Sequence, residues 1–519
     1  MEKWIRVFGQ DQVELELSMY DCLKHAHTLV GLSDPSPLVL GSTHRLLAAI
    51  LQAIYDPQDV ADIEQLLRAG QFDATRIQQF GRQYAARFEL FDPEAPFLQT
   101  GDVPLDGRQT LARQRAWSDP QPVARLFAEV PVATERTHFT HVTDESHRFC
   151  PACCARGLVT VPAFASSGGA GMRPSINGVP PMYVLPAGDT LFEALTLSLM
   201  SKGFQPRVAD SARCNAAIWT SDPPVVQKQY EVSAVGYIES LTFPARRMRL
   251  YPQTGQTVCT QCGRNTAVFV SAMLFEMGHW LTKKIELWDD PFVAFRSLKQ
   301  HELRPVRPEQ GKAVWREYTT LLLKETSSER PKVVEQVARL IDRGVLAERQ
   351  LVRFRCIGLR TDNKAKIFEW LDEALEAPPA LLTDLDAASY IDMALQQSNE
   401  GARILQITFD RHFRPERAQS GAVRNSLVRF KSVCQRMIAD YWQQLGLRFR
   451  SFINDVSHPK RRDTVQNQWA KTVVEVAQQC FDRALEQTGN HADALRIRVE
   501  AKSDCNRGLY AKRKEWLHE

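Results

Sequence analysis

Two closely spaced pairs of cysteines offer the clearest chemistry in this sequence. Cys150 and Cys153 form one C-x-x-C pair, and Cys259 and Cys262 form a second, which Gly263 follows. Each pair can bind a metal ion through two thiolates, and two pairs together make the four-sulfur tetrahedron of structural zinc. Such a site leaves no open position for water, so the pattern predicts a structural zinc ion and not a catalytic one.

Two alternatives to this metal site stay open. The four cysteines could be free buried thiols, and Cys154 could replace Cys153 as a ligand. Residues 154–258 separate the pairs, which is a longer spacing than an ordinary zinc ribbon has, so the metal would join distant parts of one domain.

The 11 cysteines are scattered and the N-terminus lacks the apolar segment of a secretory signal. Both features favour a reducing compartment, and we expect a cytoplasmic protein.

The chain lacks three sequence signatures of common enzyme classes. The sequence contains no G-x-x-x-x-G-K-[ST] phosphate loop, no H-E-x-x-H and no G-x-S-x-G. We therefore expect no enzymatic activity, with a zinc-dependent nuclease or hydrolase as the main alternative and a purely structural scaffold as the second. The glycine-rich run at residues 168–171 could cradle a phosphate or approach a nucleic-acid groove, or it could be a flexible linker.

Charge is distributed unevenly along a chain whose formal net charge is only +4. Residues 1–100 hold 8 Lys/Arg and 14 Asp/Glu, a net of −6, whereas residues 403–471 hold 14 and 5, a net of +9. The basic segment predicts a polyanionic or acidic partner, with a solvated helix surface as the alternative.

No run approaches 18 uncharged apolar residues, so we expect no membrane-spanning helix.

Periodicity predicts an α+β fold with two domains. A mixed, β-rich N-terminal domain over residues 1–375 would contain the zinc site, and an antiparallel four-helix bundle would occupy residues 380–519. The individual predictions are a hairpin over 7–17, a helix over 46–54 that Ser42-Thr43 caps and Asp56-Pro57 ends, strands over 158–161, 237–243 and 268–270, and helices over 385–411, 421–455, 466–487 and 491–515.

Several phrases, in their order and spacing, resemble one known family. They are Ala124–Thr140, the first cysteine pair, Asn177–Pro180, Gly236–Leu241, Leu287–Phe295 and Leu303–Pro305. Together with the C-terminal helices they resemble the CasA family, the large subunit of the type I-E CRISPR Cascade complex. The resemblance implies a non-catalytic DNA-binding protein that recognises the protospacer-adjacent motif (PAM), helps to open the duplex and recruits a helicase-nuclease. The implied partners are the other Cascade subunits, the guide CRISPR RNA and target double-stranded DNA, without a membrane.

The resemblance also implies roles for individual residues. Phe139 would lie against guide RNA and PAM, with His141 at a position where the family often has Asn. The backbone of the glycine run would follow the minor groove, and a wedge hairpin would separate the first base pair, with Asn363 or Lys364 in place of the usual Gln. The glycine run is Gly168, Gly169, Ala170 and Gly171, and the wedge is Arg360, Thr361, Asp362, Asn363 and Lys364. Independently of the resemblance, the charge excess over 403–471 predicts a basic face for DNA or neighbouring subunits. Its first candidates are Arg411, Arg414, Arg417, Arg424 and Lys431, and Lys460, Arg461 and Arg462 would lie in a loop.

Overall fold

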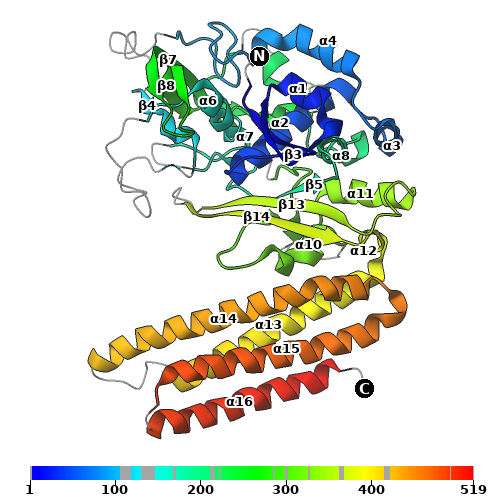
Figure 1. The fold of residues 1–519 in the computed structure, drawn as a ribbon, viewed down its shortest axis with the longest axis vertical. Coiled ribbons are helices and arrows are strands. Elements are labelled where there is room, and N and C mark those ends of the chain that lie inside the picture. Colours follow the sequence, from blue (N-terminus) through cyan, green and yellow to red (C-terminus); the bar gives the residue numbers. More distant parts are fainter. Residues whose placement is uncertain are drawn as a thin grey trace. The chain divides into compact units, whose positions relative to one another are not determined.

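The computed structural model shows a mixed α+β chain that divides into two compact units (Figure 1). It describes residues 3–105, 119–128, 130, 147–167, 171–210, 217–220, 224–283, 287–297, 302–324, 328–361, 367–413, 421–490 and 492–517. Unit 1 comprises Met1–Gln310, Ser327–Glu348 and Val352–Glu376, and unit 2 comprises Gly311–Thr326, Arg349–Leu351 and Ala377–Glu519. The predicted domain boundary between residues 375 and 380 stays a prediction, because it concerns which segments fold independently.

Unit 1 contains several small sheets surrounded by helices. Its elements are β1 (Ile5–Gly9), β2 (Glu14–Leu17), α1 (Met19–Lys24), η1 (Ala26–Thr28), β3 (Leu29–Leu32), α2 (Pro37–Tyr55), α3 (Val60–Ala69), α4 (Ala74–Tyr84), η2 (Ala85–Phe88), β4 (Gln121–Pro122), η3 (Val123–Leu126), α6 (Pro151–Leu158), α7 (Val161–Phe164), β5 (Tyr183–Ala187), α8 (Leu191–Leu197), η5 (Lys202–Phe204), η7 (Ile218–Thr220), β6 (Tyr230–Val232), α9 (Tyr237–Leu241), β7 (Arg246–Val258), β8 (Asn265–Met277), β9 (His279–Leu281), β10 (Phe295–Ser297), β11 (Leu303–Pro305), β12 (Ser328–Glu329), α11 (Lys332–Asp342), β13 (Val352–Thr361) and β14 (Ile367–Ala377). The sheet orders are β2-β1-β3, β11-β10-β12, β14-β13-β5, β4-β8-β7 and β6-β9.

The hairpin expected near the N-terminus is confirmed. Strands β1 and β2 pair antiparallel, with Phe8 opposite Glu14, and Gly9 donates its N–H to the Val13 carbonyl at 3.0 Å. Gln12 takes a positive φ of 62° in the turn, a left-handed conformation that a non-glycine residue adopts only where the surrounding bonds require it. This hairpin places Glu16 on β2, a residue that contributes to the candidate site described below.

Helix α2 is the central helix of unit 1 and begins earlier than predicted. Ser36 caps it by accepting the Val39 N–H, and Pro37 occupies the first turn, where its missing N–H costs nothing. Ser42 and Thr43, the predicted caps, lie buried inside the helix, so that prediction is wrong. The predicted end is confirmed, because the helix stops at Tyr55 and Asp56 follows in a left-handed conformation. Packing against α4, α6, α7, α8, α9 and β13 explains the apolar composition of α2.

The apolar composition of α2 also bears on the question of membrane segments. By length and composition alone α2 could cross a membrane. It contains Arg45, so it is not an uncharged apolar run of the kind that the sequence was expected to lack, and the expectation of no membrane-spanning helix stays a prediction. Within unit 1, 83% of its most apolar window is buried, as in the core helix of a folded domain.

Two of the three predicted strands are not strands. Residues 158–161 join the end of α6 to the start of α7, and each helix has a proline in its first turn that favours helix initiation. Residues 237–241 form α9, because Glu239 reaches back to accept the Gly236 N–H at 3.1 Å and so caps the helix. The third prediction, residues 268–270, is confirmed within β8. Local capping therefore outweighed the β-branched composition on which the wrong predictions rested.

Unit 2 is helical, and all four predicted C-terminal helices are confirmed. Its elements are η9 (Val314–Glu317), α10 (Tyr318–Leu322), α12 (Pro379–Thr383), α13 (Leu385–Phe413), α14 (Gly421–Val456), η11 (Pro459–Arg461), α15 (Arg462–Leu485), η12 (Glu486–Thr488) and α16 (Ala492–Trp516). Helix α13 packs against the other three long helices, and α15 packs against α14 and α16 (Figure 1). Trp516 donates to Glu400 at 3.1 Å and His412 lies 3.0 Å from Asp504, so α13 and α16 run antiparallel.

Candidate metal centre and nucleic-acid interface

Local structure places each cysteine pair at the end of an element. Cys150 is the N-cap of α6 and Cys153 lies in its first turn, so the two side chains share one helix face. Cys259 and Cys262 lie in the turn between β7 and β8, where the Gly263 N–H donates to the Cys259 carbonyl at 2.9 Å. Gly263 has a positive φ of 73°, a left-handed conformation that glycine adopts without a steric penalty.

A short backbone bridge brings the two pairs together. The residue before the first pair, Phe149, exchanges two hydrogen bonds of 2.9 Å with Val270 on β8. In addition, the Thr260 N–H donates to the Arg148 carbonyl at 2.9 Å. The segment that enters α6 is therefore fixed beside the β7–β8 turn, although the two are far apart in sequence.

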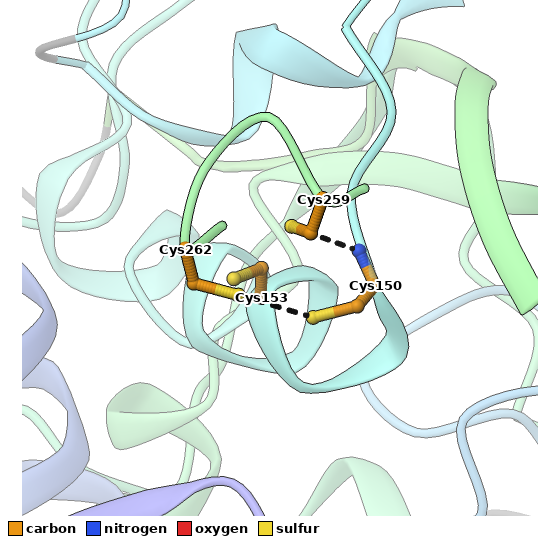
Figure 2. A group of neighbouring side chains, drawn as sticks. All are labelled: Cys150, Cys153, Cys259 and Cys262. Atoms are coloured by element: carbon orange, nitrogen blue, oxygen red, sulfur yellow. Dashed lines mark hydrogen bonds between the residues drawn. The ribbon is translucent and has the colours of Figure 1, made fainter. Parts of the chain in front are cut away.

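The four sulfur atoms converge on one point, as Figure 2 shows, and all lie within 4.8 Å of one another. The Cys150 and Cys262 sulfurs are 3.7 Å apart. A tetrahedron with metal–sulfur bonds of about 2.3 Å has an edge of roughly 3.8 Å, so this separation fits a bound metal ion. Three of the cysteines are buried and Cys262 is partly exposed. The donor set suits zinc, which would stabilise the fold there by joining the two pairs.

Hydrogen bonds within the group favour a negative charge on sulfur. The Cys150 N–H donates to the Cys259 sulfur at 3.3 Å, and hydrogen bonds from the thiols of Cys150 and Cys153 lower the pKa of Cys259. One thiolate is therefore already favoured, and a metal ion would displace the remaining protons. The structure also favours Cys153 over Cys154 as the ligand. Cys154 is fully buried and its thiol points to the Phe149 carbonyl, 3.8 Å away, outside the group.

Most residues of the predicted PAM-reading site lie outside the described part of the chain. This holds for Phe139, His141, Gly168, Gly169 and Ala170. Gly171 is described: its φ is +76°, and an added Cβ atom would meet nothing within 4 Å. A side chain at this position would be strained by the backbone conformation and not by crowding.

Arg246, which the sequence did not suggest, binds the backbone on both sides of the glycine run. Its guanidinium is buried and donates to the carbonyls of Ser166 at 2.6 Å and Arg173 at 2.8 Å. Burial lowers the pKa of Arg246 to about 10, so the group stays charged at neutral pH. A single sequence gives no signal for this role, because a basic run such as 246–249 is expected at the surface.

A cleft of about 520 Å³ begins at Arg173, shortly after the glycine run. The Arg173 guanidinium lies 4.4 Å from the centre of the Trp280 ring, which holds it at the cleft wall. Burial and then the neighbouring Arg304 lower the pKa of Arg307, as expected where positive charges gather away from water. The basic residues of the cleft are Arg173, Lys283, Arg304 and Arg307, and the acidic residue is Glu302, which pairs with Arg304 at 3.2 Å. This cleft favours an anionic ligand.

The wedge and the basic face are described only in part. Arg360 and Thr361 end strand β13, and Arg360 donates to Gln310 at 3.1 Å, whereas Asp362, Asn363 and Lys364 lie outside the described residues. In the basic face, Arg411 lies 3.7 Å from Asp504 and Lys431 is exposed on α14. Arg414 and Arg417 lie outside the described residues, as does the side chain of Arg424.

One further basic residue does not belong to a loop as expected. Lys460, Arg461 and Arg462 were predicted to be a basic loop, but Arg462 starts α15 and is buried. Its guanidinium pairs with Asp384 and donates to the Val456 carbonyl at 3.1 Å. Lys460 and Arg461 are exposed in η11 and can still face a partner.

Comparison with known proteins identifies the family. The family model of the CRISPR-associated protein Cse1 matches residues 1–480. The chain belongs to the Cse1 family. A CRISPR-associated protein CasA/Cse1 from Thermus thermophilus is 28% identical over 414 residues, which are 77% of this chain and 74% of that protein. The resemblance to the CasA family is therefore confirmed.

Solved structures share the Cse1 fold along nearly the whole chain. The crystal structure of Cse1 from Acidimicrobium ferrooxidans has a TM-score of 0.76 and 22% identity, covering 99% of this chain and 98% of that one. A chain in a structure of a CRISPR RNA-guided surveillance complex has a TM-score of 0.71 and 18% identity, covering 98% of both chains. At these identities the likeness concerns the fold alone.

Proposed function

We propose that this Cse1-family chain is the non-catalytic large subunit of a type I-E Cascade surveillance complex. The observation that carries the proposal is the family match over residues 1–480. The fold shared with a chain of an RNA-guided surveillance complex supports it. Its partners would be the guide CRISPR RNA, the other Cascade subunits, target double-stranded DNA and a helicase-nuclease, in the cytoplasm. The C-terminal helices would act as an antiparallel four-helix bundle.

Within this function, the protein would read the PAM with the backbone of the glycine run. Two observations support this role: Arg246 fixes the backbone at Ser166 and Arg173, and the cleft that begins at Arg173 carries Arg304 and Arg307. A fixed backbone without side chains can approach the floor of a minor groove. The basic cleft would contact phosphates, which position a duplex without reading its sequence.

Changing the glycine run should reduce discrimination between PAM and non-PAM DNA. Gly169→Asp places a bulky negative side chain where the backbone would approach the groove, so we expect PAM-dependent binding to fall toward the non-PAM level. Binding of the assembled complex to a PAM library measures this. The matched control is Gly203→Asp, because Gly203 is exposed and an added Cβ there meets nothing within 4 Å. An equal loss in both variants would contradict a PAM-reading role.

The non-catalytic assignment has a separate test. DNA cleavage by the purified protein would contradict it.

The wedge should act after PAM reading. Replacing Asn363 and Lys364 with Ala should impair R-loop formation on an intact duplex but not on a target already unpaired beside the PAM, because the base pair is then already open. Equal defects on both targets would assign these residues to ordinary phosphate contacts.

The basic residues of unit 2 should contribute to DNA affinity independently of sequence. Replacing Lys431, Lys460 and Arg461 with Ala should weaken binding to PAM and non-PAM DNA alike. It should also flatten the dependence of log K on log salt by about one unit per lost phosphate contact. Titrations at several salt concentrations measure both effects.

The control for this prediction removes the same charge elsewhere in unit 2. Lys502, Arg507 and Lys512 pair with acidic side chains at 2.8, 3.5 and 2.6 Å, so their replacement with Ala should leave the salt slope unchanged. If both triple variants behave alike, the exposed basic residues serve only as a solvated surface.

A further inference from the structure

Two arginines beside the cysteine group share one carboxylate. Arg156, in α6, donates from Nη1 to the Cys153 sulfur at 3.6 Å and from Nε to the Trp4 carbonyl at 2.9 Å. Its Nη2 donates to one oxygen of Glu16. Arg264, just after the second cysteine pair, donates to the other oxygen of Glu16. The carboxylate therefore bridges an arginine from each half of the cysteine site.

Charge explains why such an arrangement would matter. A divalent ion bound by four thiolates keeps a double negative charge, and burying it is costly unless positive groups or hydrogen bonds compensate. Only 6% of the Arg156 side chain is exposed, so its interaction with Cys153 is weakly screened. Glu16 and the Asp34 carboxylate, 3.9 Å from Arg156, hold this guanidinium in place. Arg264 is half-exposed and adds its charge from the solvent side.

The site is open on one side, so burial alone does not protect it. A pocket of about 170 Å³ is lined by Cys153, Cys262 and Arg156, with Arg6 and Trp370 among the other lining residues. Cys153 is buried but Cys262 is partly exposed, so small chelators and oxidants can reach the site at Cys262. Retention of the metal would then depend on how strongly the surrounding groups stabilise the metal-bound thiolates.

We infer that Glu16, Arg156 and Arg264 form a charge-compensating clasp that retains the metal and couples it to the N-terminal hairpin. Arg156 and Arg264 are positioning residues: neither binds the metal, and both act on the thiolates that would. Because Glu16 lies on β2 and Arg156 also binds the Trp4 carbonyl, the metal stabilises β1 and β2 as well as the two cysteine pairs. This inference rests on the proposed metal centre.

The rate of zinc loss to a coloured chelator tests the clasp on the full-length protein. Removing a group that supports metal ligands typically weakens metal retention 10- to 100-fold, and we expect Arg156→Met to accelerate zinc loss by that order. Glu16→Gln should act in the same direction, because it releases both arginines. Arg156→Lys should restore part of the retention, since it keeps the charge. Arg264→Met is a milder variant that removes a half-exposed side chain and should accelerate the loss less.

Arg247→Met is the matched control. Arg247 is as buried as Arg156, but it pairs with Glu276 at 2.7 Å and with Asp102 at 2.8 Å, and neither carboxylate belongs to the clasp. Its loss should lower thermal stability without accelerating zinc loss at temperatures where the protein stays folded. A structural role of Arg156 alone would make the two variants alike.

A second readout reports on the sulfur atoms themselves. With Co²⁺ in place of zinc, Arg156→Met should shift the sulfur-to-metal charge-transfer band, and hydrogen exchange should quicken in β1 and β2. If the wild-type chain binds no metal, both the metal centre and the clasp are overturned. If it binds metal but Arg156→Met and Glu16→Gln lose zinc at the wild-type rate with unchanged spectra, the clasp alone is overturned.

Discussion

Cys259→Ser should remove the metal and strongly destabilise unit 1. The wild-type chain should contain about one zinc ion, whereas the variant should contain almost none after purification, because three thiolates hold the ion poorly. Loss of a structural metal belongs to the most damaging class of substitutions, so we expect a loss of roughly 5 kcal/mol in the free energy of unfolding. Elemental analysis and thermal or urea unfolding measure the two effects.

Cys154→Ser is the natural control for this experiment. Cys154 is the neighbour of a proposed ligand and is fully buried, yet its thiol points to the Phe149 carbonyl and not into the group. A serine hydroxyl can make the same hydrogen bond, so the metal should stay bound and the stability should change little. A metal-free, stable wild-type chain, or a Cys259→Ser variant that still holds one zinc, would refute the metal centre.

Arg45→Met should be the most damaging substitution away from the cysteines. Arg45 lies in the middle of α2 with 3% of its side chain exposed, and it donates two hydrogen bonds, of 3.1 and 2.7 Å, to Asp290. Breaking a buried ion pair from one side leaves the other charge uncompensated, which costs about 3–5 kcal/mol. Asp290 would keep its hydrogen bonds from Asn177 and the Phe292 N–H, but neither group carries a charge. Urea unfolding measures the loss.

Two further variants test the cause of this loss. Arg45→Met combined with Asp290→Leu should recover part of the stability, because replacing both charges removes the desolvation penalty. Arg68→Ala breaks an exposed pair with Glu64 and should cost less than about 1 kcal/mol. A loss of under about 1 kcal/mol for Arg45→Met would show that the pair is not needed for the fold.

The long helices were predictable because their apolar pattern repeats over many turns. Helices α13, α14, α15 and α16 were expected within a few residues of their ends, since periodicity averages out local exceptions. Two short strands were predicted wrongly, because one or two capping residues decide such elements. The prolines of α6 and α7 and the Glu239 cap of α9 turned expected strands into helices.

The candidate site divides in a similar way. The four cysteines were found because metal ligands repeat with a recognisable spacing, and Cys153 was separated from Cys154 only once the backbone was known. Arg156 and Arg246 were missed because their roles depend on carbonyls and carboxylates that are far away in sequence. A basic side chain one turn after a cysteine ligand, as Arg156 is, is the one signal that sequence reasoning could have used.

Helix α2 has a consequence for synthesis on the ribosome. The partner of Arg45 lies 245 residues further along the chain. At roughly 5–20 residues per second, α2 emerges about 10–50 s before Asp290 exists. During that interval the apolar helix α2 carries an unpaired charge and lacks much of the surface that later covers it. The early nascent chain should therefore depend on chaperones that shield apolar segments, and variants that weaken the pair between Arg45 and Asp290 should prolong that dependence after release.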